Sequence, residues 1–359
     1  MSQKKKILYI VEAMGGGIFT YLVALANGLC DEFDFTIAYG IRQQTPKNFA
    51  DYFDDRVKLV EVENFTRQVR PHKDFKAYKE LKNIIKEEQP DIVHLHSSKA
   101  GAIGRLMLSK GDYKMLYTPH GYSFLMQNTG AIRTKVYRLV EKICGRKDCM
   151  TVACGRGEWQ ESIPVSKSST FISNGVDTQL IDEVLSDYHN KEDNEFTVYT
   201  VGRIGFQKNP TLFNEIAELL PNVKFLWIGQ GELDKKLISP NITVTGWTTR
   251  EKVFETASDC DVFILPSRWE GLPLALLEAM YMKKPCIVSN VVGNRDIIQN
   301  DVTGYICDTA EEFAEIIKSI QEDEKEEIIE NAYNSIIEHY NKDWVCERYR
   351  DLYLETLEN

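Results

Sequence analysis

Two glutamates eight positions apart carry the strongest chemical signal in this chain of 359 residues. Glu270 precedes Gly271, and Pro273 suits the first turn of a helix that places Glu278 two turns in. The neighbours of Glu278 are apolar, so its carboxylate needs a partner. The paired hydroxyls of a ribose suit it, because an ionised carboxylate accepts two hydrogen bonds. Glu270 can then meet a second group of the same ligand, and an ion pair within the protein is the alternative for each glutamate.

Two cations follow another strand-like run, FTVYTVGRI. Arg203 ends this run, and Lys208 comes five residues later, just before the start of a helix. Two cations at a strand end and a helix start can clamp a diphosphate, and solvated surface side chains are the alternative. Gly229 lies in a glycine turn after the next strand-like run, KFLWIGQG, and is a weak signal alone.

The first half of the chain places a glycine turn and a histidine after strand-like runs. Gly15 to Gly17 follow KILYIVEA and open a helix, where backbone can approach a phosphate closely; a tight turn is the alternative. The pattern is not GxGxxG, and the second strand, ending at Gly40, lacks the acidic residue that a dinucleotide ribose requires. NAD is therefore not expected. His120 follows KMLYTP, where either a site residue or a structural histidine fits.

Metal chemistry is not expected. His94 and His96 alternate on one strand and face the same side, but no third ligand stands at a useful spacing. Asp259 and Asp261 spell a DxD signature, yet they open the strand VFILP, at the end away from the ligand edge of a parallel sheet. The eight cysteines form no CxxC pair, which predicts reduced, buried thiols.

Strand-like and helix-like runs alternate along the chain. These elements must position the candidate site residues. This alternation predicts parallel sheets covered by helices, and the length suggests two domains at about 150 residues each. The pattern restarts near Phe196, after a polar stretch, so we expect two doubly wound α/β domains with a linker near residues 175–195. Ligands of such sheets bind beyond the carboxyl ends of the strands, and a cleft between two domains is the natural site. The run DWVCERYRDLYLETL predicts a last amphipathic helix.

Composition excludes several classes of protein. Hydrophobic residues make up 43% and charged residues 27%, which is ordinary for a globular chain and excludes a disordered one. No stretch approaches the roughly 20 apolar residues that a membrane-spanning helix needs. The basic start of the chain leads into a short apolar run, which we interpret as a first strand rather than a signal peptide, so a cytoplasmic location is expected.

Charge is distributed unevenly. The net charge is −11, yet residues 1–174 hold 26 basic and 19 acidic residues, whereas residues 175–359 hold 17 and 35. An acidic chain without a recognised motif is not expected to bind nucleic acid. Residues 308–330 hold ten acidic and two basic residues with helical spacing, which predicts a solvated helix face. Residues 67–86 hold seven basic and two acidic residues, so they form either a solvated face or a surface that attracts phosphate or anionic lipid.

Together these stretches resemble the retaining glycosyltransferases of family 4, which have the GT-B fold. The resemblance covers nearly the whole chain, and its motifs are MGGGIFTYL, PDIVHLHSSKAG, TPHG, SNGVD, VGRIGFQKNP, IGQGE and the E-x7-E motif from Glu270 to Glu278. The stretches HLHSSKAGAIGR and YTPHGYSF are also similar to the subgroup that builds capsular or exopolysaccharide units in bacteria. The resemblance implies two Rossmann-like domains facing across a deep cleft, with the C-terminal helix crossing back to the first. The expected domains are residues 1–174 plus 343–359 on the acceptor side and residues 175–342 for the nucleotide sugar.

The resemblance also implies a role for each matching residue. Arg203 and Lys208 hold the donor diphosphate, and Glu278 binds the ribose hydroxyls. His120 and Glu270 are the catalytic residues: His120 reaches the donor sugar near the reacting carbon, and Glu270 faces the sugar or the leaving phosphate. The other expected donor-binding residues are Gly16, Gly17, Gly229, Trp247, Gly271, Leu272, Pro273 and Leu274.

The implied activity is a metal-independent glycosyl transfer of the hexosyltransferase type, with retention of configuration. The donor is a nucleoside-diphosphate sugar, with UDP expected, and no other cofactor is needed. The expected acceptor is a lipid-linked glycan at the inner face of the membrane, in capsule or exopolysaccharide assembly. The residues expected on the acceptor or membrane side are Arg67, Arg70, Lys73 and Lys99. The alternatives are a nucleotide-sugar epimerase or hydrolase of the same fold, or a non-catalytic nucleotide-sugar-binding protein.

Overall fold

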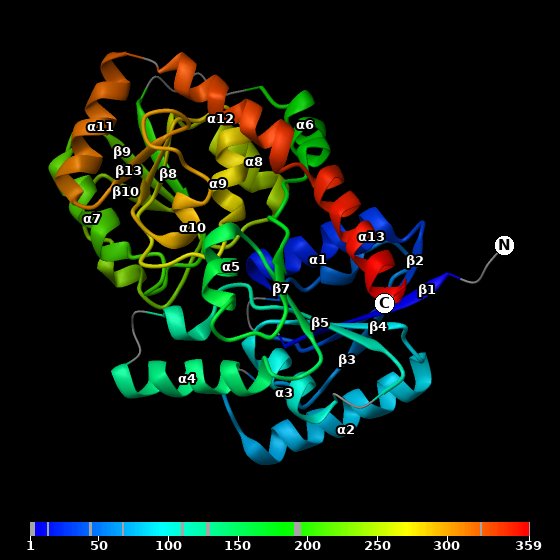
Figure 1. The fold of residues 1–359 in the computed structure, drawn as a ribbon. Helices are drawn as coiled ribbons and strands as arrows, with labels where there is room; N and C mark the ends of the chain where they lie inside the picture. The colour runs from blue at the N-terminus through cyan, green and yellow to red at the C-terminus, as the bar shows by residue number, and fades with distance from the viewer. Residues whose placement is uncertain are drawn as a thin grey trace. The chain divides into compact units, whose positions relative to one another are not determined.

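The chain folds into two compact units. The computed structural model describes residues 4–12, 14–42, 45–66, 68–108, 111–126, 130–189, 195–323 and 325–358. Unit 1 comprises Met1–Asn174 with Lys342–Asn359, and unit 2 comprises Gly175–Asn341 (Figure 1). The chain therefore passes from one unit to the other twice, and its second passage lies one residue earlier than the sequence analysis places it.

Unit 1 is built on a parallel sheet whose first strand lies inside the sheet. The strand order is β3-β2-β1-β4-β5-β6-β7, and neighbouring strands pair in parallel throughout the described residues. Within the described ranges these strands are β1 (Lys5–Val11), β2 (Phe33–Tyr39), β3 (Lys58–Glu61), β4 (Ile92–His96), β5 (Lys114–Thr118), β6 (Met150–Ala153) and β7 (Ser169–Phe171). The order runs outward in both directions from β1, as expected for a doubly wound sheet.

Helices cover both faces of this sheet. The helices of unit 1 are α1 (Gly16–Leu29), α2 (Pro71–Glu88), α3 (Ser98–Met107), α4 (Ala131–Cys144), α5 (Arg156–Ser162) and α13 (Lys342–Glu358), with short 3-10 turns η1 (Phe49–Tyr52) and η2 (Ser123–Leu125). Alternate residues of β1 enter two different cores. Tyr9 belongs to the core that contains Leu22 of α1 and Tyr349 of α13, whereas Leu8 belongs to the core that contains Leu81 of α2.

The last helix completes the core of unit 1. The hydroxyl of Tyr353 on α13 lies 2.9 Å from that of Tyr9 on β1, and Tyr21 on α1 donates to the hydroxyl of Tyr349 over 2.5 Å. A β-carbon at Gly28 would lie 2.5 Å from the sulfur of Cys346, so α1 and α13 pack too closely for any other residue there. The predicted return of the C-terminal helix to the first domain is confirmed.

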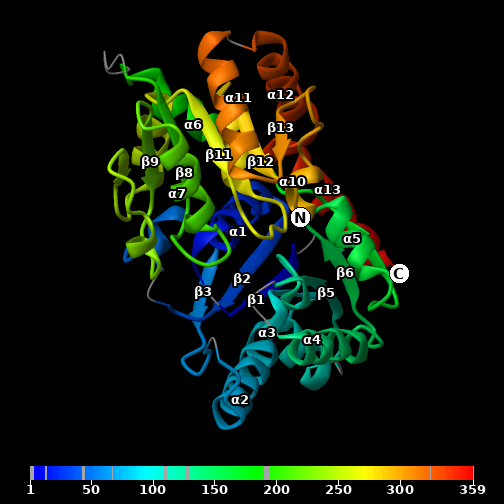
Figure 2. The same ribbon diagram turned by 90° about the vertical axis from the view of Figure 1, so that its left-hand side faces the viewer.

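Unit 2 repeats the same topology. Its strand order is β10-β9-β8-β11-β12-β13. Its strands are β8 (Thr197–Val201), β9 (Lys224–Ile228), β10 (Ile242–Val244), β11 (Val262–Leu265), β12 (Cys286–Ser289) and β13 (Tyr305–Cys307). Its helices are α6 (Thr178–Ser186), α7 (Pro210–Leu219), α8 (Arg250–Ser258), α9 (Leu274–Tyr281), α10 (Val292–Arg295), α11 (Ala310–Glu322) and α12 (Glu326–His339), with the 3-10 turn η3 (Asp234–Lys236). Figure 2 shows the sheet of each unit from a second side. The predicted pair of doubly wound α/β domains is confirmed.

The linker expected near residues 175–195 is wrong over Thr178–Ser186, which form a helix. Helix α6 occupies the stretch, capped by the side chain of Asp177, which accepts a hydrogen bond from the backbone of Leu180 over 3.3 Å. Tyr281 on α9 donates to both carboxylate oxygens of Asp182 over 2.8 Å. The expected linker is therefore in part a capped helix, and residues 190–194 lie outside the described part of the chain.

Two other predictions about surface and core hold. All eight cysteines are buried and free, as expected for reduced thiols. In the acidic stretch, α11 starts with a capping box between Thr309 and Glu312 and buries Phe313 and Ile317, while its acidic side chains are exposed. The solvated helix face is confirmed for the residues that the structure describes. Within the same residues, no helix combines the length and apolar composition that crossing a bilayer requires.

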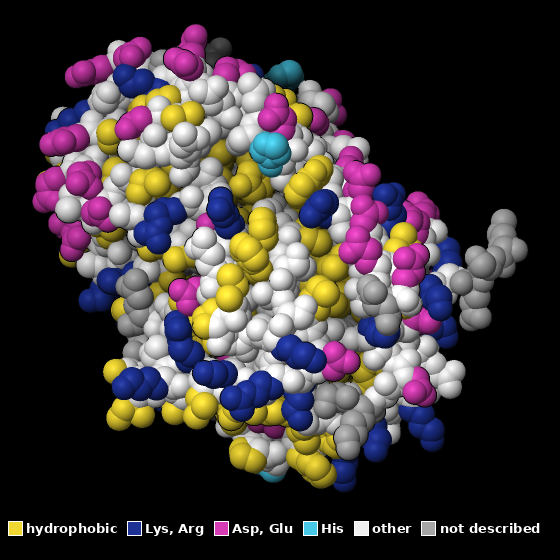
Figure 3. Space-filling view, in the orientation of Figure 1, with side chains coloured by type: hydrophobic (Ala, Val, Ile, Leu, Met, Phe, Trp, Pro, Cys, Tyr) yellow, Lys and Arg dark blue, Asp and Glu magenta, His cyan; other side chains and the backbone are white. Residues whose placement is uncertain are grey.

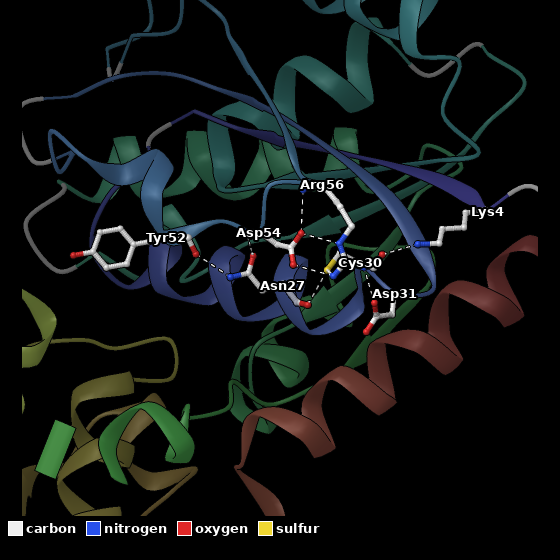
Figure 4. A network of polar contacts seen from close by, with 7 residues as sticks. All are labelled: Lys4, Asn27, Cys30, Asp31, Tyr52, Asp54 and Arg56. Atoms are coloured by element: carbon white, nitrogen blue, oxygen red, sulfur yellow. Dashed lines mark hydrogen bonds and ion pairs between the residues drawn. The ribbon is translucent and has the colours of Figure 1, made fainter. Parts of the chain in front are cut away.

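A network of polar contacts ties the end of α1 to the segment before β3 (Figure 4). Arg56 lies at its centre: it contacts Asp31 at 2.6 Å, Asp54 at 2.7 Å and the sulfur of Cys30 at 3.0 Å. Asn27 accepts a hydrogen bond from the backbone of Asp54 over 2.9 Å. Burial raises the pKa of the Cys30 thiol, so the sulfur stays protonated and structural.

Candidate active site

In unit 2, three predicted site residues follow three neighbouring strands. Strands β9, β8 and β11 are adjacent and parallel, so their carboxyl ends lie at one edge of the sheet. Arg203 follows β8, Gly229 follows β9 and Glu270 follows β11. The strand order reverses between β8 and β11, and ligands of doubly wound sheets bind at such a switch point. The sheet therefore places these residues at its expected binding edge.

Glu270 lies at the centre of a buried polar cluster. Only 7% of the residue is exposed, and its oxygen Oε1 accepts from Lys208 Nζ over 2.8 Å and from Ser267 Oγ over 2.6 Å. Its other oxygen accepts from Gln207 Nε2 over 3.2 Å. The structure therefore brings together Glu270 and Lys208, which are 62 positions apart. The sequence analysis missed Gln207 and Ser267. Gln207 stands in the quoted motif VGRIGFQKNP, and Ser267 stands three positions before Glu270.

Arg203 does not join this cluster. Its Nε and Nη2 atoms both lie 2.9 Å from Oε2 of Glu232, and more than a third of each side chain is exposed. An exposed ion pair of this kind contributes little free energy, because water solvates both charges well when they separate. The guanidinium can therefore exchange Glu232 for a phosphate at small cost.

Glu278 has a partner within the protein. Arg250, the first residue of α8, donates to Oε1 of Glu278 over 2.6 Å, and only 4% of Glu278 is exposed. The ion pair that the sequence analysis gives as the alternative is therefore present, because Arg250 satisfies the charge of Glu278. The ribose contact itself stays a prediction. Arg250 was missed because nothing near it in sequence links it to Glu278.

The backbone after Glu270 is tightly packed. Leu272, Pro273 and Leu274 are buried, and Pro273 is the N-cap of α9 rather than its first residue. A β-carbon at Gly293 would lie 2.2 Å from the carbonyl oxygen of Gly271, so helix α10 packs closely against this turn. The turn is thus rigidly held, and its contact with a donor stays a prediction.

Two further glycine turns lie at the same sheet. Gly229 has a φ of +141°, and a β-carbon there would lie 2.2 Å from the carbonyl oxygen of Gly202, so the close approach of two loops requires glycine. Gly246 has a φ of +80°, and Trp247 beside it is 57% exposed. The ring of Trp247 lies open after β10, and its expected place beside a nucleobase stays a prediction.

In unit 1, the predicted glycine turn starts a helix without a side-chain cap. Gly15 is the N-cap of α1, and no side chain caps the helix there. Gly16 has a φ of +60°, and no atom lies within 4 Å of a β-carbon built on it. Gly17 follows within the first turn. Uncapped N–H groups at a helix start attract anions, so the geometry suits the predicted phosphate contact.

His120 lies at the end of a row of buried polar side chains. Its Nε2 atom is 3.1 Å from Nδ1 of His96, and its Nδ1 atom is 3.3 Å from the sulfur of Cys154. His94 contacts Thr118 over 2.9 Å and Tyr353 over 3.0 Å. Both ring nitrogens of His120 are thus engaged within unit 1, and its contact with a donor sugar stays a prediction.

A buried carboxylate holds the backbone on both sides of this row. Glu158 is 1% exposed and accepts from the backbone N–H of Gly121 over 2.5 Å and of Cys154 over 2.7 Å. Its two oxygens therefore fix the residue after His120 and the residue that contacts the His120 ring. No spacing in the sequence connects Glu158 to position 120. The sequence analysis therefore missed this residue, and its burial in the structure reveals it.

The histidines of this row are neutral. Burial lowers the pKa of His94 and of His120 to about 3, and burial with the neighbouring His94 lowers the pKa of His96 well below its ordinary value. In the unfolded chain the pKa of a histidine is about 6.5. Between this pH and the lower pKa of the folded state, the unfolded state therefore binds protons that the folded state does not bind. The stability contribution is thus present above pH 6.5 and is lost as the pH falls from about 6.5 towards 3.

We expect the free energy of unfolding to fall steeply below pH 6.5. Each neutral buried histidine contributes up to about 1.4 kcal/mol per pH unit in this window. Urea unfolding between about pH 7 and pH 5 measures the slope. The variant His120→Gln should lower the slope of the unfolding free energy against pH by the contribution of one histidine. The variant His72→Asn, at an exposed position, should leave that slope unchanged. An unchanged slope in His120→Gln would contradict the assignment.

The structure assembles no metal site in its described part: no group of three or more His, Cys, Asp or Glu side chains there could hold a metal ion. The two aspartates of the DxD signature have structural partners. Asp261 accepts from the backbone of Thr197 over 2.7 Å, and Asp259 accepts from the Tyr188 hydroxyl over 2.8 Å. They stand before β11, at the edge opposite Glu270, as the sequence predicts.

The described residues that are expected on the acceptor side lie at the start of α2 and beside it. Lys99 is engaged inside unit 1: its ammonium lies 2.7 Å from Asp74 and donates to the carbonyl oxygens of Thr66 and Gln68. These contacts hold the loop before α2. They occupy the ammonium that the prediction assigns to the acceptor or membrane side. Arg70 is exposed and Lys73 partly exposed at the start of α2, and Arg67 lies outside the described residues.

Comparisons with known proteins agree with this architecture. Residues 182–335 match the family described as Glycosyl transferases group 1, and residues 15–180 match the one described as Glycosyltransferase Family 4. The UDP-Gal:alpha-D-GlcNAc-diphosphoundecaprenol alpha-1,3-galactosyltransferase of Escherichia coli is 31% identical over 340 residues, covering 86% of this chain and 87% of the relative. A Campylobacter jejuni relative, GalNAc-alpha-(1->4)-GalNAc-alpha-(1->3)-diNAcBac-PP-undecaprenol alpha-1,4-N-acetyl-D-galactosaminyltransferase, is 25% identical over 368 residues, covering 95% and 97%.

Solved structures share the fold along the whole chain. Sucrose-phosphate synthase from Thermosynechococcus elongatus superposes with a TM-score of 0.82 at 17% identity, covering 98% of this chain and 99% of that one. The Anabaena protein Alr3699/HepE, in complex with UDP and glucose, gives a TM-score of 0.77 at 15% identity, covering 98% and 100%. The identity to the E. coli relative over most of both chains, with the matching topology, shows that this chain is a glycosyltransferase of family 4 with the GT-B fold.

Proposed function

We propose that this glycosyltransferase moves a sugar from a UDP-sugar to a lipid-linked glycan, with retention of configuration and without a metal. The observation that carries the donor part is the Lys208–Glu270 pair at the switch point of unit 2, with Arg203 on the adjacent strand end. The acceptor part is supported by the two relatives above, whose names specify diphosphoundecaprenol or PP-undecaprenol acceptors. The first of them is also named for a UDP-sugar donor. Such acceptors belong to polysaccharide assembly at the inner face of a membrane, where we place this protein.

The chemistry follows from where charge develops. When the bond between the anomeric carbon and the diphosphate breaks, negative charge grows on the leaving phosphate and the sugar becomes oxocarbenium-like. Donors held in place for that charge stabilise the transition state without a metal. Lys208 is held in place by Glu270 at 2.8 Å and keeps further N–H donors, while Arg203 can exchange Glu232 for phosphate.

Glu270 positions rather than attacks. Both of its oxygens accept hydrogen bonds, from Lys208, Ser267 and Gln207, and these contacts hold the carboxylate in place and lower its nucleophilicity. Retention then follows from attack by the acceptor hydroxyl on the face that the diphosphate leaves, and the hydroxyl proton passes to the departing diphosphate oxygen. Glu270 serves this step by fixing Lys208 and by its place beside the donor.

Replacing Glu278 with alanine should weaken UDP binding about ten- to hundredfold. A hydrogen bond to a charged group contributes about 1.5–3 kcal/mol, and each 1.4 kcal/mol is tenfold in affinity. Isothermal titration with UDP and with its 2′-deoxy form separates the ribose contact from the Arg250 ion pair. Wild type should lose affinity for the deoxy form, and Glu278→Ala should bind both forms equally. Equal affinity of wild type for both forms would contradict the ribose role.

A thermal-shift panel tests the proposed donor. We expect UDP to raise the melting midpoint equally with and without magnesium, and GDP, ADP, dTDP, CDP and NAD to raise it less, because ligand binding stabilises the native state by mass action. A shift that requires magnesium, or one with NAD alone, would contradict the proposal. A product assay with an undecaprenyl-diphosphate sugar then distinguishes transfer from hydrolysis or epimerisation, and the anomeric configuration of the product tests retention.

A further inference from the structure

Helix α4 turns its apolar side away from the rest of unit 1. Ile132, Val136, Leu139 and Ile143 are 82%, 49%, 57% and 44% exposed. Val140 beside them is 36% exposed. Their spacing of four, seven and eleven residues puts them on one stripe of the helix. In a helix that packs on a core, a stripe of this kind faces inward, so its outward position needs a reason.

A buried ion pair on the opposite side fixes the rotation of α4. Glu141 accepts from Arg105 Nη2 over 2.7 Å and from the Tyr117 hydroxyl over 3.1 Å. Arg105 and Glu141 are 1% and 4% exposed, and the guanidinium lies 3.8 Å from the centre of the Tyr117 ring. Cys144, three positions further on, is also buried. Turning the apolar stripe inward would leave a buried Arg105 without its partner, which costs more than the exposed stripe.

The exposed charges of α4 are all basic. Its described acidic residue is the buried Glu141, whereas Arg133, Lys135, Arg138 and Lys142 are exposed. Lys135 and Lys142 are seven positions apart and lie along one side of the stripe, and Arg133 lies along the other. Arg138 pairs with Glu161 over 3.0 Å. Figure 3 shows dark blue and yellow side chains together over the place of α4 in Figure 1.

We propose that α4 lies in the interface of an anionic bilayer, with its apolar stripe below the headgroups and its flanking cations on the lipid phosphates. A helix with an apolar face and basic borders binds membranes in this orientation. A second copy of the chain is a poorer partner, because two such faces would bring like charges together. The inference deepens the proposed function and rests on it for the lipid-linked acceptor, whereas binding to vesicles needs neither donor nor acceptor.

Helix α2, the basic stretch of the sequence analysis, differs from α4 in its apolar content. Its exposed large apolar side chain is Phe75, at 49%, and the ammonium of Lys79 lies 4.9 Å above the Phe75 ring. Helices α2 and α4 both contact α3. We therefore assign insertion to α4 and only charge attraction to α2.

Vesicle flotation tests the assignment. The full chain should float with vesicles of phosphatidylglycerol and phosphatidylethanolamine and much less with phosphatidylcholine alone. The variant Val136→Ser/Leu139→Ser/Ile143→Ser should lower the ratio of bound to free protein at least tenfold. The matched control Leu219→Ser/Ile238→Ser removes apolar side chains that are 43% and 73% exposed in unit 2, and it should float like wild type. Equal flotation of the α4 variant and wild type would overturn the proposal.

A second set of variants separates α4 from α2 and from self-association. Lys135→Gln/Lys142→Gln should weaken flotation on anionic vesicles more than Lys76→Gln/Lys82→Gln on α2, and the reverse order would overturn the assignment to α4. A wild-type dimer in sedimentation velocity that the serine variant dissociates, without vesicle binding, would also overturn it. The thermal shift with UDP should be unchanged in every α4 variant, so failure of the membrane proposal and failure of the proposed donor give different results.

Discussion

The variant Lys208→Ala is expected to lower kcat/KM by about 10²- to 10³-fold. Loss of one preorganised donor to a developing negative charge has effects of about this size. The loss should fall mainly on kcat, because the charge on the leaving diphosphate is greatest in the transition state. Steady-state kinetics with the donor identified by the thermal-shift panel measures it. Lys208→Met, which keeps the length of the side chain without its charge, should be equally impaired.

A matched control guards against a purely structural effect of this substitution. Lys236→Ala removes an exposed lysine from the turn η3 of the same unit and should leave kcat within about twofold of wild type. Loss of Lys208 also removes the cation beside the buried Glu270, so the melting midpoint of Lys208→Ala is measured in parallel. A variant that folds as wild type and turns over at more than a third of its rate would refute the role of Lys208.

The variant Glu141→Ala should lower the free energy of unfolding by about 3–5 kcal/mol. It leaves the buried guanidinium of Arg105 without its carboxylate, and removing one partner of a buried pair typically costs this much. Arg105 also has a buried Nη1 atom without a hydrogen-bond partner, so no other acceptor stands ready to compensate. Urea unfolding of the variant against wild type measures the difference.

The surface pair between Arg138 and Glu161 is the internal comparison for this effect. The same helix carries both pairs, but these two side chains are 48% and 33% exposed, so Glu161→Ala should cost about 1 kcal/mol or less. The double variant Arg105→Met/Glu141→Leu should recover most of the stability, because it removes both charges together. A loss in Glu141→Ala as small as that in Glu161→Ala would contradict the assignment.

The architecture was predictable because it depends on local patterns that repeat. Apolar runs of strand length alternate with helical spacing through both units, and glycines or prolines mark the strand ends. The positions of Arg203, Gly229 and Glu270 at one sheet edge followed from the same logic, since parallel strands end together. The return of the last helix came from the family resemblance rather than from any pattern in the chain.

The partners of the site residues were not predictable in the same way. Arg250 meets Glu278 only because α8 and α9 present them to each other, and Cys154 meets His120 only because the ends of β5 and β6 place them together. Such pairs depend on sheet order and helix rotation, which no local spacing encodes. Lys99, expected on the acceptor side, has its ammonium bonded to Asp74 and to the loop before α2, and no local spacing predicts these contacts either.

The outward stripe of α4 is a third case. Its spacing in the sequence is that of a helix packed on a core, and the buried Glu141 reverses that reading. Periodicity shows where the apolar and polar faces of the helix lie relative to each other. Which face packs against the rest of unit 1 depends on Arg105, the partner of Glu141 that lies 36 residues away.

The division of the chain has a consequence for its synthesis on the ribosome. Unit 2 is one continuous segment, Gly175–Asn341, and can close while the chain is still growing, whereas unit 1 waits for the 17 residues of α13. Until they emerge, Tyr9 and Tyr21 lack the hydroxyl partners that α13 supplies, and the face of the first sheet that α1 and α13 share is only partly covered. Unit 1 is therefore completed after unit 2, and nascent chains should need chaperone protection until α13 has emerged.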